Sequence, residues 1–464
     1  MFKHIYPTLF SCFFLSISWG QSFSENPYSA LGIGESDALI EARFGGVGSA
    51  NTSVYDSVTI NTFNPASYAF LSKGMPLFGV SFASNISEYT QNGVSRNGRI
   101  VGITNFSLII PFKNRFGIAF GLKPYTRKGY SFKNYSLFEG DSVEYSYLGS
   151  GSTQNAFVGF SHVPIKNKKN ELAFGLNAGY VFGKIQTERR SKFIGTTLEG
   201  AADINEVNLG SFNFNLGALY TRNFCFPRNQ AVNEKSELVL NHRLTVGVTY
   251  EPEVVLGAKK TYGLYFSNTD IDDLNSYDTI SFEENIKGEI TMPQKLSFGL
   301  TYTYRPLAAN RTGKTIYALT FHGNYTSVTS STYQEKFNDI ITTQNIYVDA
   351  KTINFGIEFL PKAKNDVKSL KFDYIKRIQY RVGFTNQNFS YTYNSNQYKQ
   401  SSITMGLGLP LGNVNSNTRI NLSAQYGSRT AGSGSFEQKI WSFGVGIVVA
   451  PALYDSWFRK YKLD

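Results

Sequence analysis

The chain has 464 residues, of which 17% are charged and 15% are aromatic, and its formal net charge is +11. Soluble globular proteins usually carry about 25% charged residues and fewer aromatic ones. The abundant Tyr, Phe and Thr instead suit pleated, half-exposed strands. After residue 20, no segment reaches the roughly 18 consecutive apolar residues that a membrane helix needs. The composition therefore excludes helical bundles and helical membrane proteins, and it favours a large all-β protein with an apolar exterior.

Residues 1–20 have the pattern of a secretory signal peptide. A basic start at Lys3 is followed by an apolar stretch, and Gly20 is the small residue before the expected cleavage. Cleavage would leave Cys225 as a single cysteine, which excludes an internal disulfide. Cys225 itself, beside a predicted periplasmic turn, is either a small residue without a chemical role or a reactive thiol. The basic residues are scattered, so they indicate a membrane surface and no nucleic acid.

Residues 21–75 differ from the rest because they show little strand alternation. They contain several glycines between positions 32 and 48, and then an Asn64-Pro65-Ala66 turn. Glycine allows one backbone to approach another closely. We therefore predict that this segment, the hatch, folds as a plug inside a lumen. Asn64, Pro65 and Ala66 either gate the lumen or shape a turn of the hatch.

From residue 76 to residue 450 the sequence alternates between apolar and polar residues. In one stretch Ile353, Phe355 and Ile357 alternate with Asn354 and Gly356. Each stretch runs for about ten residues or more, which is the length of a tilted membrane strand. The polar set is small and uncharged, as suits a lumen, so the apolar set is expected to meet outer-membrane lipids.

The sequence predicts an all-β fold, a 14-stranded antiparallel transmembrane β-barrel over 76–450 with the N-terminal hatch in its lumen. An even strand count is typical of closed bacterial barrels, and closure leaves no unpaired edge in lipid. Every second strand ends at or just before a proline, because proline cannot donate to a ladder. The strands are expected near 76–86, 98–111, 115–127, 152–164, 171–187, 205–223, 241–266, 288–305, 314–327, 350–360, 376–390, 397–409, 418–429 and 438–450.

The two ends of the predicted barrel differ. The proline-marked turns are mostly short and basic, which indicates the periplasmic side, whereas the opposite connections are long and polar. These long connections are expected as loops at 128–151, 187–204, 267–287 and 328–349. Residues 451–464 are expected as a periplasmic tail, either an interfacial anchor or a partner-docking segment.

Pro252 departs from this pattern because it falls inside the seventh predicted strand. It predicts a kink or a bulge there, and hence a local defect in the wall.

Several motifs resemble the FadL family of outer-membrane transporters. Ala42–Ala50 and Asn64–Ala66 look like the hatch of that family, and Ile290–Tyr302 looks like one of its strands. Asn26–Ser29 and Trp457–Lys460 resemble the Bacteroidota branch. The resemblance implies a hatch-plugged barrel that admits hydrophobic ligands from outside and releases them laterally through a kinked wall.

No motif indicates catalysis, so no enzyme, cofactor or metal site is expected. The histidines His162, His242 and His322 are too far apart for zinc spacing. The acidic residues between 270 and 284 lack the EF-hand pattern and fit a solvated loop better than a calcium site.

Arg419 is expected in the lumen. It would either meet a ligand carboxylate or pair with the hatch acids Glu41 or Asp56.

Two functions stay open at this point. The first is a passive channel in the outer membrane of a Gram-negative cell for hydrophobic small molecules such as long-chain fatty acids. The alternative is a barrel that transports nothing and serves as a subunit of a protein secretion or outer-membrane assembly complex, with periplasmic or outer-membrane protein partners. The predicted lumen is more polar than a channel for lipophilic molecules needs.

Overall fold

The computed structural model describes most of the chain. The signal peptide predicted at 1–20, the tail predicted at 451–464 and the boundary predicted at 75 lie outside the described residues. The described ranges are 26–36, 39–71, 76–112, 115–195, 200–225, 240–267, 277–306, 317–338, 340–342, 346–361, 374–411 and 418–450.

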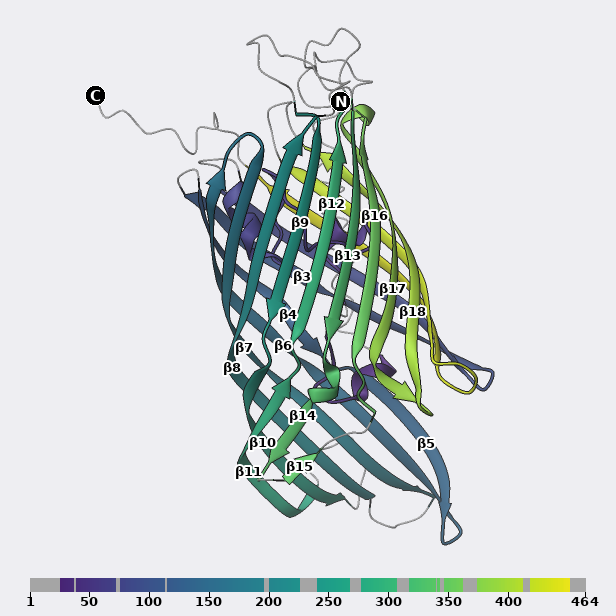
Figure 1. The fold of residues 1–464 in the computed structure, drawn as a ribbon. Coiled ribbons are helices and arrows are strands. Elements are labelled where there is room, and N and C mark those ends of the chain that lie inside the picture. Colours follow the sequence, from purple (N-terminus) through teal and green to yellow (C-terminus); the bar gives the residue numbers. More distant parts are fainter. Residues whose placement is uncertain are drawn as a thin grey trace, which may run out of the picture.

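Fourteen antiparallel membrane strands close into one barrel, as the sequence predicts (Figure 1). The first strand, β2, pairs with the last, β20, so the ladder returns to its start. Two of the fourteen strands are interrupted: β9 and β10 are the two segments of one strand, and β11 and β12 are the two segments of the next. The strands are β2 (Leu77–Gln91), β3 (Val94–Phe112), β4 (Phe116–Arg127), β6 (Asp141–Lys166), β7 (Asn170–Ile194), β8 (Gly200–Phe224), β9 (His242–Glu251), β10 (Val254–Ser267), β11 (Tyr277–Met292), β12 (Lys295–Tyr304), β13 (Ala318–Val328), β16 (Ala350–Leu360), β17 (Gln379–Tyr393), β18 (Asn396–Pro410), β19 (Arg419–Thr430) and β20 (Glu437–Val449).

The outer face of the barrel is apolar and the inner face is polar. Phe355 on β16 is 56% exposed, whereas its neighbour Asn354 is 3% exposed. Successive side chains of a strand point to opposite faces, so this contrast repeats along the strands. In the described part of the chain, no helix is long and apolar enough to cross a membrane.

Several strands continue far beyond the length that a bilayer needs. β6 has 26 residues and β7 and β8 have 25 each, whereas about 9–11 residues cross a membrane. Together with β5 (Tyr130–Phe138), β10, β11, β14 (Gln334–Phe337) and β15 (Ile340–Thr342), they form a sheet at one end of the molecule, the outer sheet (Figure 1). Much of the predicted loops is therefore strand. Beyond the membrane both faces of a strand meet water, so polarity does not distinguish a strand from a loop.

The hatch lies inside the barrel. Its elements are η2 (Pro27–Ala30), β1 (Glu35–Ser36), α2 (Ala42–Gly45) and η3 (Pro65–Phe70). β1 pairs with β4, α2 contacts β18, β19 and β20, and η3 contacts β4, β6, β7 and β8. Two further short helices, η6 (Ser330–Thr332) and η8 (Ile375–Arg377), lie beside strands. The predicted fold class is confirmed.

Glycines on the luminal face let the hatch touch the wall directly. If any one of the wall glycines named below carried a Cβ atom, that atom would lie closer than 3.0 Å to an atom of hatch residues 46–69. Since the neighbour is in most cases hatch backbone, any side chain would push the hatch off the wall. These residues, the glycine ring, are Gly79, Gly117, Gly159, Gly175, Gly217, Gly247, Gly299, Gly356, Gly383 and Gly406.

Replacing Gly175 with Ala is expected to destabilise the protein, because the new Cβ would overlap the backbone of Pro65 and Ala66. Such overpacking costs roughly 1–3 kcal/mol of the free energy of unfolding, which urea titration of the purified barrel measures. Gly323→Ala is the matched control, since a Cβ there would only touch the Phe355 ring at 3.9 Å. Equal stability of the two variants would contradict the close contact.

Candidate functional site

The Asn64-Pro65-Ala66 turn begins η3 and binds the wall. The Asn64 side-chain oxygen accepts a hydrogen bond from the Ala66 N–H at 3.0 Å, which caps the helix. Its amide group donates to the Thr52 carbonyl at 2.7 Å and to the Ala218 carbonyl of β8 at 3.3 Å. The motif therefore shapes the hatch turn and attaches it to β8, while a gating role stays a prediction.

A second turn of the hatch is bound by side chains from three neighbouring strands. Gly48 has φ +65°, a conformation that favours glycine. Its carbonyl accepts hydrogen bonds from Asn354 at 2.6 Å and Thr385 at 2.8 Å, and its N–H donates to Thr404 at 2.9 Å. The polar side chains of the lumen thus pair the irregular backbone of the hatch.

A buried ion cluster joins the hatch to β16 and β17. One carboxylate oxygen of Glu358 lies 2.8 Å from an Arg43 nitrogen and 2.9 Å from Nε of Arg381. Arg381 also donates to Asn421 on β19 at 2.9 Å and to Gln379. Neither Glu358 nor Arg381 was predicted from the sequence as a site residue. The available signal was their position in the alternation, on the luminal side between apolar residues.

Aromatic residues hold the hatch at the end of the lumen near the outer sheet. The Tyr28 ring stacks on Tyr391 at 5.5 Å and meets the edge of Tyr398 at 5.1 Å. Arg429 lies over the Tyr28 ring and donates to Glu35 at 2.8 Å. This end of the lumen is filled as well.

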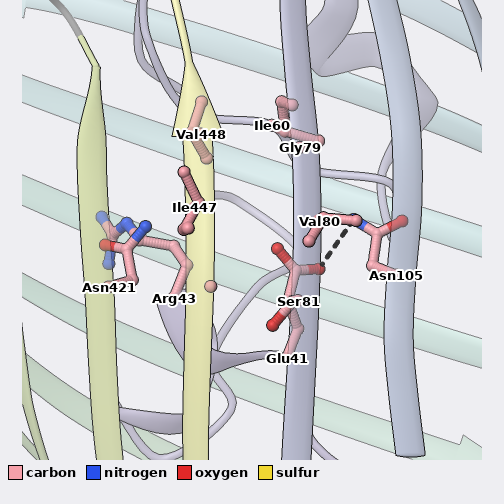
Figure 2. A pocket seen from close by; sticks show the side chains of 11 residues that line it. Glu41, Arg43, Ile60, Gly79, Val80, Ser81, Asn105, Asn421, Ile447 and Val448 are labelled. Atoms are coloured by element: carbon pink, nitrogen blue, oxygen red, sulfur yellow. Dashed lines mark hydrogen bonds between the residues drawn. The ribbon is translucent and has the colours of Figure 1, made fainter. Parts of the chain in front are cut away.

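Glu41 lies between the hatch and the wall, beside a small cavity of about 10 Å³ shown in Figure 2. The side chain of Asn105 donates to the Glu41 carboxylate at 3.4 Å, and Ser81 accepts from the Ala42 N–H at 3.2 Å. Burial raises the pKa of Glu41 to about 8, although Arg43 opposes this shift. The carboxyl group of Glu41 is therefore mostly protonated, and so neutral, at pH 7.

Arg419 begins β19, and its electrostatic partners include Asp56 and Glu358. Its Nε atom is buried and has no hydrogen-bond partner in the described part of the chain. The structure thus brings Arg419 towards one of the two predicted acids, Asp56. A contact with a ligand stays a prediction.

The wall is interrupted at Pro252. β8 pairs with β9 over Leu216–Phe224 and with β10 over Gly200–Leu209. Between these two ranges, segment 210–215 of β8 forms no ladder pair with β9 or β10. A hydrogen bond from the Ser211 hydroxyl to the Val255 carbonyl, at 3.3 Å, crosses this gap.

The neighbouring strands break beside it. Pro293 and Gln294 separate β11 from β12, and η6 separates β13 from β14. The N–H of Thr329, just before η6, donates to the Gln294 carbonyl at 3.2 Å. The breaks therefore form a continuous line between the barrel and the outer sheet.

The histidines, Cys225 and the acidic loop, which were the other candidates for a chemical role, do not form a common site in the described part of the chain. His162, His242 and His322 lie on β6, β9 and β13, and the described residues contain no cluster of His, Cys, Asp and Glu that could hold a metal ion. Cys225 is a half-buried free thiol. Residues 270–273 of the acidic loop lie outside the described residues.

The sequence profile of the BamG family matches residues 1–464, the whole chain. The chain belongs to the BamG family. No curated protein matches it.

Solved structures share the fold at low sequence identity. The Ralstonia pickettii toluene transporter TbuX is 12% identical with a TM-score of 0.52, and the match covers 89% of this chain and 98% of TbuX. The CymD monoaromatic hydrocarbon channel is 12% identical with a TM-score of 0.50, over 89% of this chain and 98% of CymD. The P. putida toluene transporter TodX is 13% identical with a TM-score of 0.50, again over 89% and 98%. This BamG-family chain therefore has the fold of FadL-type outer-membrane barrels.

Replacing Glu358 with Gln leaves two buried guanidinium groups without their shared carboxylate. We expect a loss of about 3–5 kcal/mol in the free energy of unfolding, measured by urea titration. Glu88→Gln is the control, because it breaks an exposed pair with Lys439 at 3.9 Å and should change stability by no more than about 1 kcal/mol. A Glu358 variant as stable as the control would show that the cluster does not hold the hatch.

Raising the pH is expected to loosen the hatch around Glu41. The folded pKa of about 8 exceeds the ordinary value of 4.5, so the protonated form stabilises the fold. This contribution is complete below about pH 4.5 and is lost as the pH rises through about 8. Hydrogen exchange of residues 39–50 should therefore accelerate between about pH 5 and pH 8 and level off at higher pH, after correction for the intrinsic rate.

Glu41→Gln, which stays neutral, should abolish this acceleration, whereas the exposed Glu88→Gln should retain it. The same pH dependence in both variants would exclude Glu41 as its origin.

Proposed function

We propose that this chain is a closed barrel of the Gram-negative outer membrane and serves as a subunit of an outer-membrane assembly complex. The observation that carries this proposal is the filled lumen. The hatch touches the wall along the glycine ring, its Gly48 turn is hydrogen-bonded by β16, β17 and β18, and Arg43 pairs with Glu358. The family name, BamG, supports the same interpretation.

The proposal includes the sequence-based domain organisation. A signal peptide at 1–20 would direct export, the hatch at 21–75 would stay in the lumen, and the barrel at 76–450 would span the membrane. The tail at 451–464 would face the periplasm, and the resemblance of 26–29 and 457–460 to the Bacteroidota branch would make that group the bacterial source.

The outer sheet supplies the surface on which we expect a protein partner. Among the described strands, β5 pairs with β6 alone, so its other edge is unpaired. Tyr135, Leu137 and Phe138 on β5 are 58%, 77% and 53% exposed. An exposed apolar edge is a place where another protein chain binds.

Native mass spectrometry of the protein extracted gently from its own membrane tests this proposal. We expect a stoichiometric protein partner and no adduct of a hydrocarbon or a free fatty acid on the barrel. Leu137→Glu should reduce recovery of the partner at least tenfold, because it places a charge on the apolar edge. Ser136→Glu on the same strand is the matched control and should retain the partner, and loss of migration as a folded barrel would identify a misfolded variant.

A lone barrel in the wild-type extract, or equal recovery from both variants, would contradict this assignment.

The second candidate is the passage of hydrophobic small molecules, with lateral exit into the membrane. The specific observation in its favour is the interrupted ladder between β8 and the β9–β10 strand at Pro252. TbuX is a toluene transporter and CymD a monoaromatic hydrocarbon channel, and this chain shares their fold. Small lipophilic adducts on a lone barrel would support this candidate and identify the ligand class, with fatty acids as the first probe.

A further inference from the structure

A cavity of about 100 Å³ lies between the hatch and the wall, at the end of the barrel where β12 and β16 end and β9 and β13 begin. We call it the arginine cavity. Three cations and two carboxylates take part in its lining, among hydroxyl groups and a few apolar side chains. The lining residues on which the argument depends are Arg43, Asp56, Arg243, Arg305, His322 and Glu358.

Two residues that line the cavity carry buried nitrogen atoms without hydrogen-bond partners in the described part of the chain. Nε and Nη1 of Arg43 and Nε2 of His322 form no hydrogen bond within the described part of the chain. Arg43 is 7% exposed and His322 is 5% exposed, so bulk water does not satisfy these atoms. Buried polar groups without partners are uncommon, and each calls for an acceptor such as a bound water or an anion.

The charges around the cavity leave a positive excess. Glu358 is already shared by Arg43 and Arg381, which leaves Asp56 as the other lining acid. Arg243 lies over the Tyr55 ring at 4.0 Å, so this ring positions its guanidinium group without neutralising it. Arg305 is exposed and remains accessible.

We propose that the arginine cavity binds one oxyanion, a carboxylate or a phosphate, between Arg43 of the hatch and Arg243 and Arg305 of the wall. Guanidinium groups donate in a fork that matches both anions. A volume of about 100 Å³ admits a headgroup and no long chain. Such an anion would add a bridge between the hatch and β9. This site does not depend on the subunit role proposed above.

Isothermal titration of the purified full-length protein with inorganic phosphate and with acetate tests the site. We expect binding of at least one of these anions, and at least tenfold weaker binding in Arg243→Gln and in Arg305→Gln. Neither side chain belongs to the Arg43–Glu358–Arg381 cluster, so both variants should migrate as folded barrels. Arg99→Gln is the control. Arg99 is exposed near the start of β3, at the end of the barrel away from the arginine cavity.

Native mass spectrometry of wild type and of both variants separates the two sources of the anion. A phosphate-bearing lipid adduct that both variants lose would assign the site to a headgroup. Binding of free phosphate or acetate in the isothermal titration, without such a lipid adduct, would assign the site to a soluble anion. No binding of either anion and no adduct, or equal binding in all variants, would overturn the proposal.

Discussion

Irregular backbone placed inside a β-barrel needs both space and hydrogen-bond partners, and the hatch of this protein receives both from the wall. A buried N–H or C=O group that lacks a partner costs as much as a lost hydrogen bond. The glycine ring provides the space, and luminal side chains such as Asn354, Thr385 and Thr404 provide the partners at Gly48. The polar lumen therefore serves to bind a plug, and it is not evidence for an aqueous channel.

The same contacts bear on function. A fold shared with hydrocarbon channels describes the barrel and leaves open what the lumen contains. Here the hatch is fixed at several levels, from the Tyr28 cluster to η3, and displacing it would break many contacts together. The break at Pro252 lies in the wall, so a lateral route would not require the hatch to leave. The two candidate functions thus depend on different parts of one structure.

Charge in the lumen follows from the hatch as well. Arg43 would be a costly buried cation without Glu358, and Glu358 also neutralises Arg381 on the adjacent strand. One carboxylate between two guanidinium groups leaves a positive excess. That excess, together with the unpaired nitrogens of Arg43, makes the arginine cavity chemically distinct from the rest of the polar lumen.

Residue-by-residue alternation was enough to predict the strands and the apolar exterior, and the prolines at strand ends gave their number, because each of these depends on the immediate environment of one strand. The plugged lumen was predicted from the glycines of segment 21–75, which lacks that alternation. It also located Pro252 as a defect. Only the tertiary structure showed that Glu358 meets Arg43, that the gap at Pro252 lies opposite segment 210–215 of β8, and that the strands continue into the outer sheet. The physical reason is that alternation tells which face a side chain occupies. It does not tell which distant segment lies across the lumen, nor where the bilayer ends along a strand.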